Sequence, residues 1–375
     1  MLIPYNQLSE EQKGVIRRIS RESGNLFVEG PPGSGKTLIS LYTLADIIQQ
    51  SNVKPFLIIY NQSLYGYLSS ALKELGIQDN LTIVTKDKFI WDKARNEFGI
   101  PSPDSKLAYM EKYNYLLDNL LKQNIRKEYD VTIIDEVQDI NKKEWELIQR
   151  LSKRVLALGD FNQGVYKTDL TKSIVSSTGL FERLTKIFRF HKNIAKIAQI
   201  FSRNNEDLEN KVSIDSATVP KLIDVKEETE FQEIGNILKS ISAFRQRVGV
   251  ICPDREILEN LNAYLDENKI ENKYYTENRD LRTHDFSSTT PLLISCFSSK
   301  GLEFEHVIVF GFNKSNEKII KLINDDKLKD LLYVSITRSN KNLYIIRTEN
   351  TVDELKNLKV ENPNSGEGLT LDDIF

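Results

Sequence analysis

Short apolar runs rich in β-branched residues alternate along the first half of the chain with longer segments whose apolar residues recur every three or four positions. Runs of the first kind predict strands and segments of the second kind predict helices. The predicted strands are Leu26–Glu29, Pro55–Tyr60, Leu81–Thr85, Val131–Asp135 and Val155–Gly159. The predicted helices are Lys36–Gln49, Leu64–Leu75, Lys88–Glu97, Lys106–Ile125 and Lys142–Leu151. This order predicts a parallel sheet with helices on both faces.

The same alternation continues in the second half of the chain. The predicted strands there are Lys221–Val225, Arg247–Cys252, Lys273–Tyr275, Pro291–Cys296, Val307–Gly311 and Asn342–Arg347. The predicted helices are Thr229–Ser242, Arg255–Asn268 and Lys327–Ser339. We therefore expect two α/β lobes that join near Lys186. The last stretch, residues 350–375, turns acidic and rich in Gly, Pro and Asn, and we expect it to be a mobile tail.

Composition narrows the class of protein. The 375 residues suffice for two domains, and 40% apolar with 28% charged residues is typical of a globular protein. A net charge of −3 gives no argument for nucleic acid binding, so any such surface must be a local groove. The first residues, MLIPYNQLSEEQKG, do not resemble a signal peptide, and no apolar stretch is long enough to span a bilayer. We expect a cytoplasmic protein with no membrane contact, whose two cysteines, Cys252 and Cys296, are buried thiols rather than zinc ligands.

The strongest motif follows the first predicted strand. Residues 30–37 read GPPGSGKT and open a helix, which is the context that a phosphate-binding P-loop requires. Glycines let backbone N–H groups approach phosphate oxygens, and the helix N-terminus favours an anion. The alternative is a glycine-rich turn before an ordinary helix, but the full pattern arises by chance in roughly one chain in a hundred of this length. The candidate phosphate-binding residues are Gly30, Gly33, Ser34, Gly35, Lys36 and Thr37.

A pair of carboxylates ends the apolar strand at Val131 to Ile134. Asp135 is placed to hold Mg²⁺ together with Thr37, and Glu136 to orient and deprotonate the attacking water. An apolar run that ends in two acids is by itself usually a strand entering solvent. The P-loop upstream makes the catalytic interpretation the better one.

The residues around this pair carry a family resemblance. DEVQD at residues 135–139 resembles the DExQD motif of superfamily 1 helicases of the UvrD/Rep-like group. Further matches follow in family order: Gln12 in LSEEQ, YNQSL at 60–64, TKDKF at 85–89, GDFNQ at 159–163, FRF at 188–190, SKGLEF at 299–304 and YVSITR at 333–338. Each of these motifs is weak alone, but the ordered set is specific and covers the chain as far as about Arg347.

The resemblance implies a fold and a division of the chain. The fold would be two RecA-like P-loop NTPase lobes with mainly parallel sheets. Residues 1–186 would form lobe 1A, with a short helical 1B-like segment at about 92–129, and residues 187–349 lobe 2A. These lengths leave no room for a large 2B-like domain, so strong unaided unwinding of duplex is not expected.

The resemblance also assigns roles to single residues. Gln12 would read adenine and Glu303 would contact the ribose. Gln163 would sense the γ-phosphate, while Arg189 and Arg338 of the second lobe would act as arginine fingers. Strand contacts are expected from Tyr60, Asn61, Thr85, Ser299 and Lys300. After Gln163 the family has an aromatic that stacks on a base, and here Thr168 holds that position.

The implied function is an ATP- and Mg²⁺-dependent translocase or helicase on single-stranded nucleic acid, with DNA favoured over RNA. ATP hydrolysis at the lobe interface would be coupled to lobe closure. The alternative is a nucleotide-switched regulatory subunit that gates a partner such as a nuclease. The acidic end, Leu371 to Phe375, could then contact a partner, although a solvated tail is the simpler interpretation.

Overall fold

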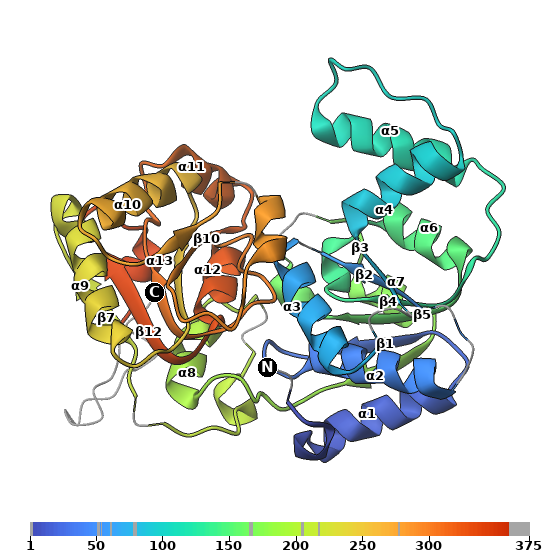
Figure 1. Cartoon of the computed structure of the whole chain (residues 1–375), viewed down its shortest axis with the longest axis horizontal. Coiled ribbons are helices and arrows are strands. Elements are labelled where there is room, and N and C mark those ends of the chain that lie inside the picture. The colour runs from blue at the N-terminus through green and yellow to red at the C-terminus, as the bar shows by residue number, and fades with distance from the viewer. Residues whose placement is uncertain are drawn as a thin grey trace. The chain divides into compact units, whose positions relative to one another are not determined.

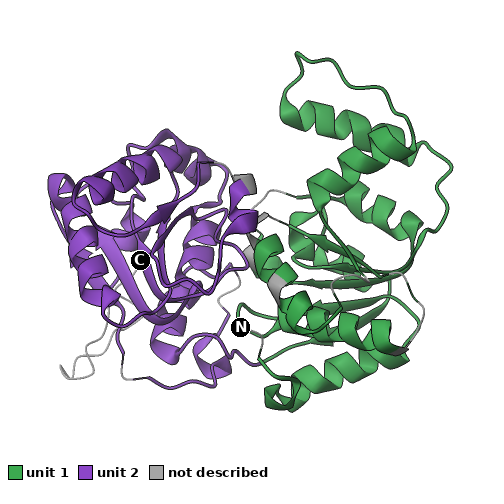
Figure 2. Ribbon diagram, in the orientation of Figure 1, with its two compact units in different colours: residues 1–185 green, residues 186–375 purple. Residues whose placement is uncertain are grey.

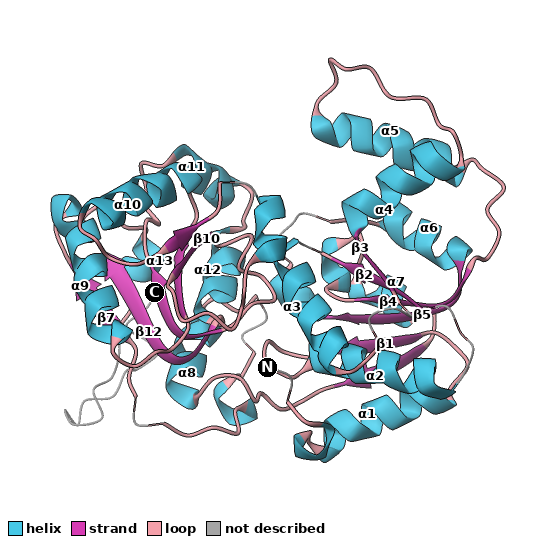
Figure 3. Ribbon diagram, viewed as in Figure 1, coloured by secondary structure: helices cyan, strands magenta, loops and turns pink. Residues whose placement is uncertain are grey.

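The computed structural model describes residues 3–50, 53, 55–60, 62–77, 81–164, 168–203, 206–216, 218–276 and 278–359. The chain divides into two compact units, Met1–Thr185 and Lys186–Phe375, which are coloured separately in Figure 2. Each unit is a parallel sheet covered by helices (Figures 1 and 3). The expected α/β fold class of two parallel-sheet lobes is confirmed.

The sheet of the first unit has six parallel strands in the order β3-β2-β4-β5-β1-β6. Their bounds are β1 Leu26–Glu29, β2 Pro55–Ile59, β3 Thr82–Thr85, β4 Tyr129–Ile134, β5 Ser152–Gly159 and β6 Leu180–Arg183. Five of these strands lie where the hydrophobic pattern predicts them. The sixth, β6, is an edge strand with a mixed burial pattern, which explains why no apolar run marks it.

The helices of this unit lie between the strands. They are α1 Glu10–Arg21, α2 Lys36–Gln50, α3 Gln62–Glu74, α4 Lys86–Asp92, α5 Tyr109–Leu121, α6 Lys142–Leu151 and α7 Lys172–Ser176. A π-helical turn, Lys93–Glu97, continues α4, and short 3₁₀ turns occupy Val137–Asp139 and Phe161–Gln163. The segment expected to be a short helical insertion therefore holds the π turn and α5.

Alternate residues of each strand point to opposite faces of the sheet and build two cores. Leu26 and Val28 pack with α1, α2 and α3 on one face. Phe27, between them in sequence, packs with α4, α5 and α6 on the other face. Because both faces are covered, the strands read as continuous apolar runs rather than as an alternation.

The second unit repeats this architecture with the order β7-β12-β11-β8-β10-β9, and all of its strand pairs are parallel. The strands are β7 Lys221–Asp224, β8 Val248–Cys252, β9 Lys273–Tyr274, β10 Leu292–Ser295, β11 Phe304–Val309 and β12 Ser339–Arg347. The helices are α8 Lys192–Ile200, α9 Glu230–Ser242, α10 Arg255–Glu267, α11 Glu317–Asn324, α12 Leu328–Ile336 and α13 Asp353–Lys356.

Helices α9 and α10 cover one face of the second sheet, whereas α12 packs against α8, β11 and β12. Both cysteines are buried and free, and burial raises the pKa of each thiol, as expected for reduced core residues. None of the described helices is long and apolar enough to cross a bilayer.

Candidate functional site

The carboxyl ends of three neighbouring strands of the first unit bring the predicted motifs together. In the sheet, β1 lies beside β5, and β5 lies beside β4. The register pairs Glu29 with Gly159, and the Gly30 N–H donates to the Gly159 carbonyl over 3.2 Å. Residues that follow these strands therefore meet at one sheet edge, where ligands of open α/β sheets bind.

The phosphate loop has the backbone that its glycines predict. Gly33 has φ 77° and Gly35 has φ 90°, which is the left-handed region that side chains with a Cβ avoid. At Gly35 an added Cβ would lie 2.2 Å from the Gln12 amide nitrogen. Space and backbone conformation together require glycine at this position.

Lys36 begins α2 and folds back over the loop. Its ammonium donates to the carbonyls of Gly30 at 2.7 Å and Pro31 at 3.2 Å, and the residue is 8% exposed. The hydroxyl of Ser34 is buried and has no hydrogen-bond partner among the residues that the structure describes. These contacts fit a phosphate site, because phosphate oxygens are better partners for the ammonium than carbonyl groups.

Gln12 is tied to the loop as well as to its own helix. With Ser9 it forms the capping box of α1, in which the Ser9 N–H donates to the Gln12 side chain over 2.9 Å. The Gln12 amide also donates to the Ser34 carbonyl over 2.8 Å. The structure thus places the predicted adenine-reading residue directly against the phosphate loop.

Thr37 and Asp135, the two residues predicted to hold Mg²⁺, are in contact. The Thr37 hydroxyl donates to the Asp135 carboxylate over 2.8 Å, although 98 residues separate them in sequence. Burial and the neighbouring Glu136 raise the pKa of Asp135 to about 6, against the opposing effects of Thr37 and Lys36. A hydroxyl and a buried carboxylate on adjacent elements fit a hard cation that prefers oxygen ligands.

Glu136 has a left-handed backbone, with φ 60° and ψ 48°. Its N–H donates to the Asp135 carboxylate over 3.1 Å, and its own carboxylate accepts from the Gln138 amide. Non-glycine residues in this region are uncommon and cluster at active sites. The geometry fits a general base held beside the metal site.

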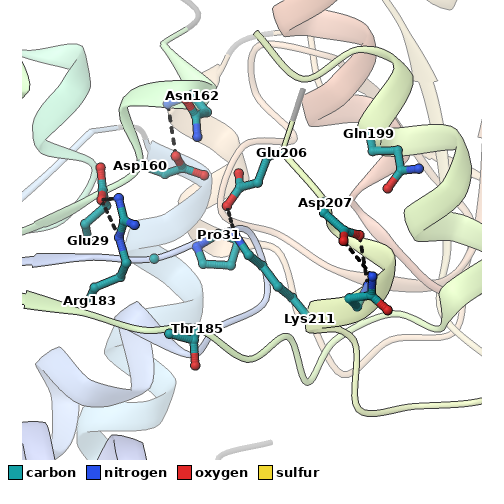
Figure 4. A network of polar contacts seen from close by, with 12 residues as sticks. Glu29, Pro31, Asp160, Asn162, Arg183, Thr185, Gln199, Glu206, Asp207 and Lys211 are labelled. Atoms are coloured by element: carbon teal, nitrogen blue, oxygen red, sulfur yellow. Dashed lines mark hydrogen bonds and ion pairs between the residues drawn. The ribbon is translucent and has the colours of Figure 1, made fainter. Parts of the chain in front are cut away.

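The predicted γ-phosphate sensor lies in the 3₁₀ turn after β5. Asp160 caps this turn by accepting from the Asn162 N–H over 2.9 Å (Figure 4). The backbone of Gln163 ends the turn, whereas its side chain lies outside the described residues. The structure therefore brings the segment, but not a described side-chain contact, to the site.

The sequence motifs do not mark Glu29, the last residue of β1, as a site residue. Its carboxylate accepts from Arg183 at 2.9 Å and from Lys172 at 2.5 Å, and Figure 4 shows the arginine lying against it. The pairing fixes the strand end from which the phosphate loop leaves. Only the pairing of β1 with β6 brings the two side chains together, so no local pattern could predict this contact.

In the second unit the structure brings together the three residues assigned to ATP. Glu303 and Arg338 precede β11 and β12, whose first residues, Phe304 and Ser339, pair in register. Arg189 donates to the Glu303 carboxylate over 3.1 Å. Adjacent parallel strands therefore account for the proximity of Glu303 and Arg338, which lie far apart in sequence.

Arg338 is 2% exposed and held by its surroundings. Its guanidinium donates to the carbonyls of Val334 at 2.9 Å and Leu302 at 3.1 Å, and to the Thr337 hydroxyl at 3.2 Å. An arginine finger must present this group to phosphate, so the side chain would have to leave part of this network.

The predicted strand-contacting residues are mostly buried. Thr85, Ser299 and Lys300 lie in the interior of their units, and the Ser299 hydroxyl donates to the Cys296 carbonyl over 2.8 Å. Tyr60 is half-buried, with the Lys86 ammonium 5.8 Å from its ring centroid. Asn61 lies outside the described residues. In this conformation the three buried side chains offer little surface to a strand.

Comparisons with known proteins identify the family of the chain. Residues 104–347 match the model of the viral superfamily 1 RNA helicase core domain, and residues 12–169 match the model of an AAA domain. No curated protein matches the sequence.

Two solved structures of viral helicases are similar to the chain. One is the arterivirus nonstructural protein 10 helicase in complex with DNA, at 14% identity and a TM-score of 0.45, covering 92% of this chain and 65% of that one. The other is the PRRSV helicase, at 14% identity and a TM-score of 0.42, covering 90% of this chain and 55% of that one. The chain thus spans less than two thirds of the length of either structure.

Proposed function

Since the chain belongs to the family of superfamily 1 helicase cores, we propose that it is an ATP-driven translocase on single-stranded nucleic acid. The observation that carries the proposal is the Thr37–Asp135 contact beside the phosphate loop. It joins a phosphate-binding loop to a metal-binding carboxylate at the edge of one sheet, with Glu136 next in the chain. This set of groups suits hydrolysis of a nucleoside triphosphate.

Each predicted site residue of the first unit has a distinct role in the proposal. The Lys36 ammonium replaces its hydrogen bonds to the loop carbonyls with hydrogen bonds to phosphate oxygens, and the loop N–H groups bind the same phosphates. Thr37 and Asp135 hold Mg²⁺, which neutralises charge on the phosphates when bound. Glu136 accepts a proton from the attacking water.

The second unit supplies positive charge in this proposal. Arg189 and Arg338 would stabilise the charge that develops on the transferred phosphoryl group, and such an arginine is worth about 10³–10⁵ in rate. Both guanidiniums have protein partners in this structure, Glu303 and the Leu302 carbonyl respectively. Hydrolysis would therefore need both units and an exchange of partners, which gives a way to couple it to movement along a strand.

The test is steady-state ATP hydrolysis measured in parallel with no polymer, single-stranded DNA, single-stranded RNA and duplex DNA. The proposal predicts that single strands raise kcat well above the rate without polymer, and that duplex does so less. The two single-stranded arms decide between DNA and RNA. Directional movement is then measured by displacement of streptavidin from a biotin at either strand end.

Tight ATP binding with a turnover that no polymer changes would reject the translocase. It would instead favour the nucleotide-switched regulatory role, in which ATP and ADP states bind a partner protein with different affinities.

A further inference from the structure

Resting on the proposed hydrolysis, we infer that Gln138 is a positioning residue that fixes the general base Glu136 and joins it to the segment after β5. Gln138 lies in the 3₁₀ turn that follows β4 and is 2% exposed. Buried amides are costly unless their polar atoms are paired, so the partners of this side chain matter.

Three polar groups of Gln138 have hydrogen-bond partners. Its side-chain NH₂ donates to the Glu136 carboxylate, and its side-chain carbonyl accepts from the Asp160 N–H over 3.0 Å. Its backbone carbonyl accepts from the Thr168 hydroxyl over 3.1 Å. A carboxylate only accepts and a backbone N–H only donates, so these partners also fix which end of the amide points each way.

Glu136 needs such a partner because its backbone conformation is costly. A non-glycine residue in the left-handed region is disfavoured by about 1–2 kcal/mol. The Asp135 carboxylate and the 3₁₀ turn hold the backbone, through the Glu136 N–H and carbonyl. Gln138 donates a hydrogen bond to the carboxylate itself.

The neighbouring strand leaves room for this amide. At Gly159, the last residue of β5, an added Cβ would lie 2.4 Å from the Gln138 side-chain oxygen and 2.8 Å from a Val137 methyl group. Glycine here therefore serves the close approach of Gln138 to β5. It also brings the Asp160 N–H within reach of the side chain.

Thr168 extends the connection beyond the 3₁₀ turn. In the helicases that the chain resembles, an aromatic at this place stacks on a base, but here the side chain is a half-buried hydroxyl bonded to Gln138. Thr168 is thus anchored to the residue that holds the base. A displacement of Thr168 would therefore be transmitted to Glu136 through Gln138.

The experiment is a double-mutant cycle of Gln138→Met and Glu136→Gln, each alone and combined, with Gln149→Met on α6 as the matched control. Methionine keeps the length of the side chain but can neither donate nor accept as an amide does. Two quantities are measured for every protein: kcat and KM for ATP, and the free energy of unfolding in urea. Tryptophan fluorescence reports on the first unit, because both tryptophans, Trp91 and Trp145, lie in it.

We expect Gln138→Met to lower kcat by about 10- to 100-fold with KM changed less than about threefold, since a charge-assisted hydrogen bond is lost. Once Glu136 is already glutamine, the same change should lower kcat little further. Gln149→Met should match the wild type.

The inference would be overturned if Gln138→Met lowered kcat equally whether residue 136 is Glu or Gln. A wild-type kcat in Gln138→Met would also overturn it. The unfolding cycle does not depend on turnover and should show coupling between the two positions. If the wild type hydrolysed no ATP, the proposed function would fail while this coupling still decided whether Gln138 holds Glu136. Additive unfolding energies would reject the contact.

Discussion

Replacing Asp135 by Asn should stabilise the first unit in the absence of Mg²⁺ and nucleotide. The carboxyl group is buried beside Glu136, and its pKa is raised from 3.8 to about 6. Above that pH the folded protein must keep a charge in a site that disfavours it. Asparagine removes the charge and can still accept the hydrogen bond from Thr37.

The size and the pH dependence of this stabilisation follow from the raised pKa of Asp135. The change from 3.8 to about 6 corresponds to roughly 3 kcal/mol at 1.36 kcal/mol per pH unit. The folded state binds more protons than the unfolded state between these values, so the stability of the wild type falls as pH rises through this window and stays low above it. The gain from Asp135→Asn should be about 2–3 kcal/mol at pH 8 and near zero at about pH 4.

Urea unfolding in EDTA, followed by tryptophan fluorescence, measures this gain in the first unit. A gain of this size should raise the urea midpoint by about 1 M at pH 8. Asp118→Asn, which changes an exposed carboxylate on α5, serves as the control and should stay within about 0.5 kcal/mol of the wild type. Addition of Mg²⁺ and ATP should stabilise the wild type and not Asp135→Asn. A gain independent of pH, or none at pH 8, would refute the reasoning.

Three further outcomes are expected. Gly35→Ala should weaken ATP binding and lower the stability of the first unit by about 1–3 kcal/mol, since the new Cβ would meet Gln12 at a positive φ; this is measured by titration and urea unfolding. Glu136→Gln should bind ATP as tightly as the wild type but lower single-turnover hydrolysis by about 10²–10⁴. Arg338→Lys should lower kcat by about 10³ and, because the bond to Leu302 is lost, also reduce the thermal stability of the second unit in calorimetry; a wild-type kcat would remove Arg338 from the mechanism.

Much of the fold could be predicted because its strands are buried on both faces and carry uniform apolar runs. The edge strand β6 has no such run, since only part of it is covered. Helix α1 was not predicted from periodicity, although Ser9 and Gln12 form a capping box whose residues stand three apart in the sequence. That local signal could have found the start of the helix.

The candidate site likewise contains a part that local sequence patterns predict and a part that they do not. The loop from Gly30 to Thr37 and the pair Asp135–Glu136 are local patterns next to strands, so their chemistry can be predicted from the sequence. The contacts of Gln138 with Asp160 and of Glu29 with Arg183 depend on which strands are neighbours. Strand order is a tertiary property, and short-range patterns do not encode it.

The central claim is that the loop around Lys36 binds ATP and hydrolyses it when a single strand is bound. The most direct measurement compares ATP hydrolysis by the wild type and by Lys36→Ala, with and without single-stranded DNA or RNA, at matched folded protein. The account predicts polymer-stimulated hydrolysis by the wild type and none by Lys36→Ala. Hydrolysis that persists in Lys36→Ala, or a wild type that hydrolyses no ATP with either polymer, would contradict it.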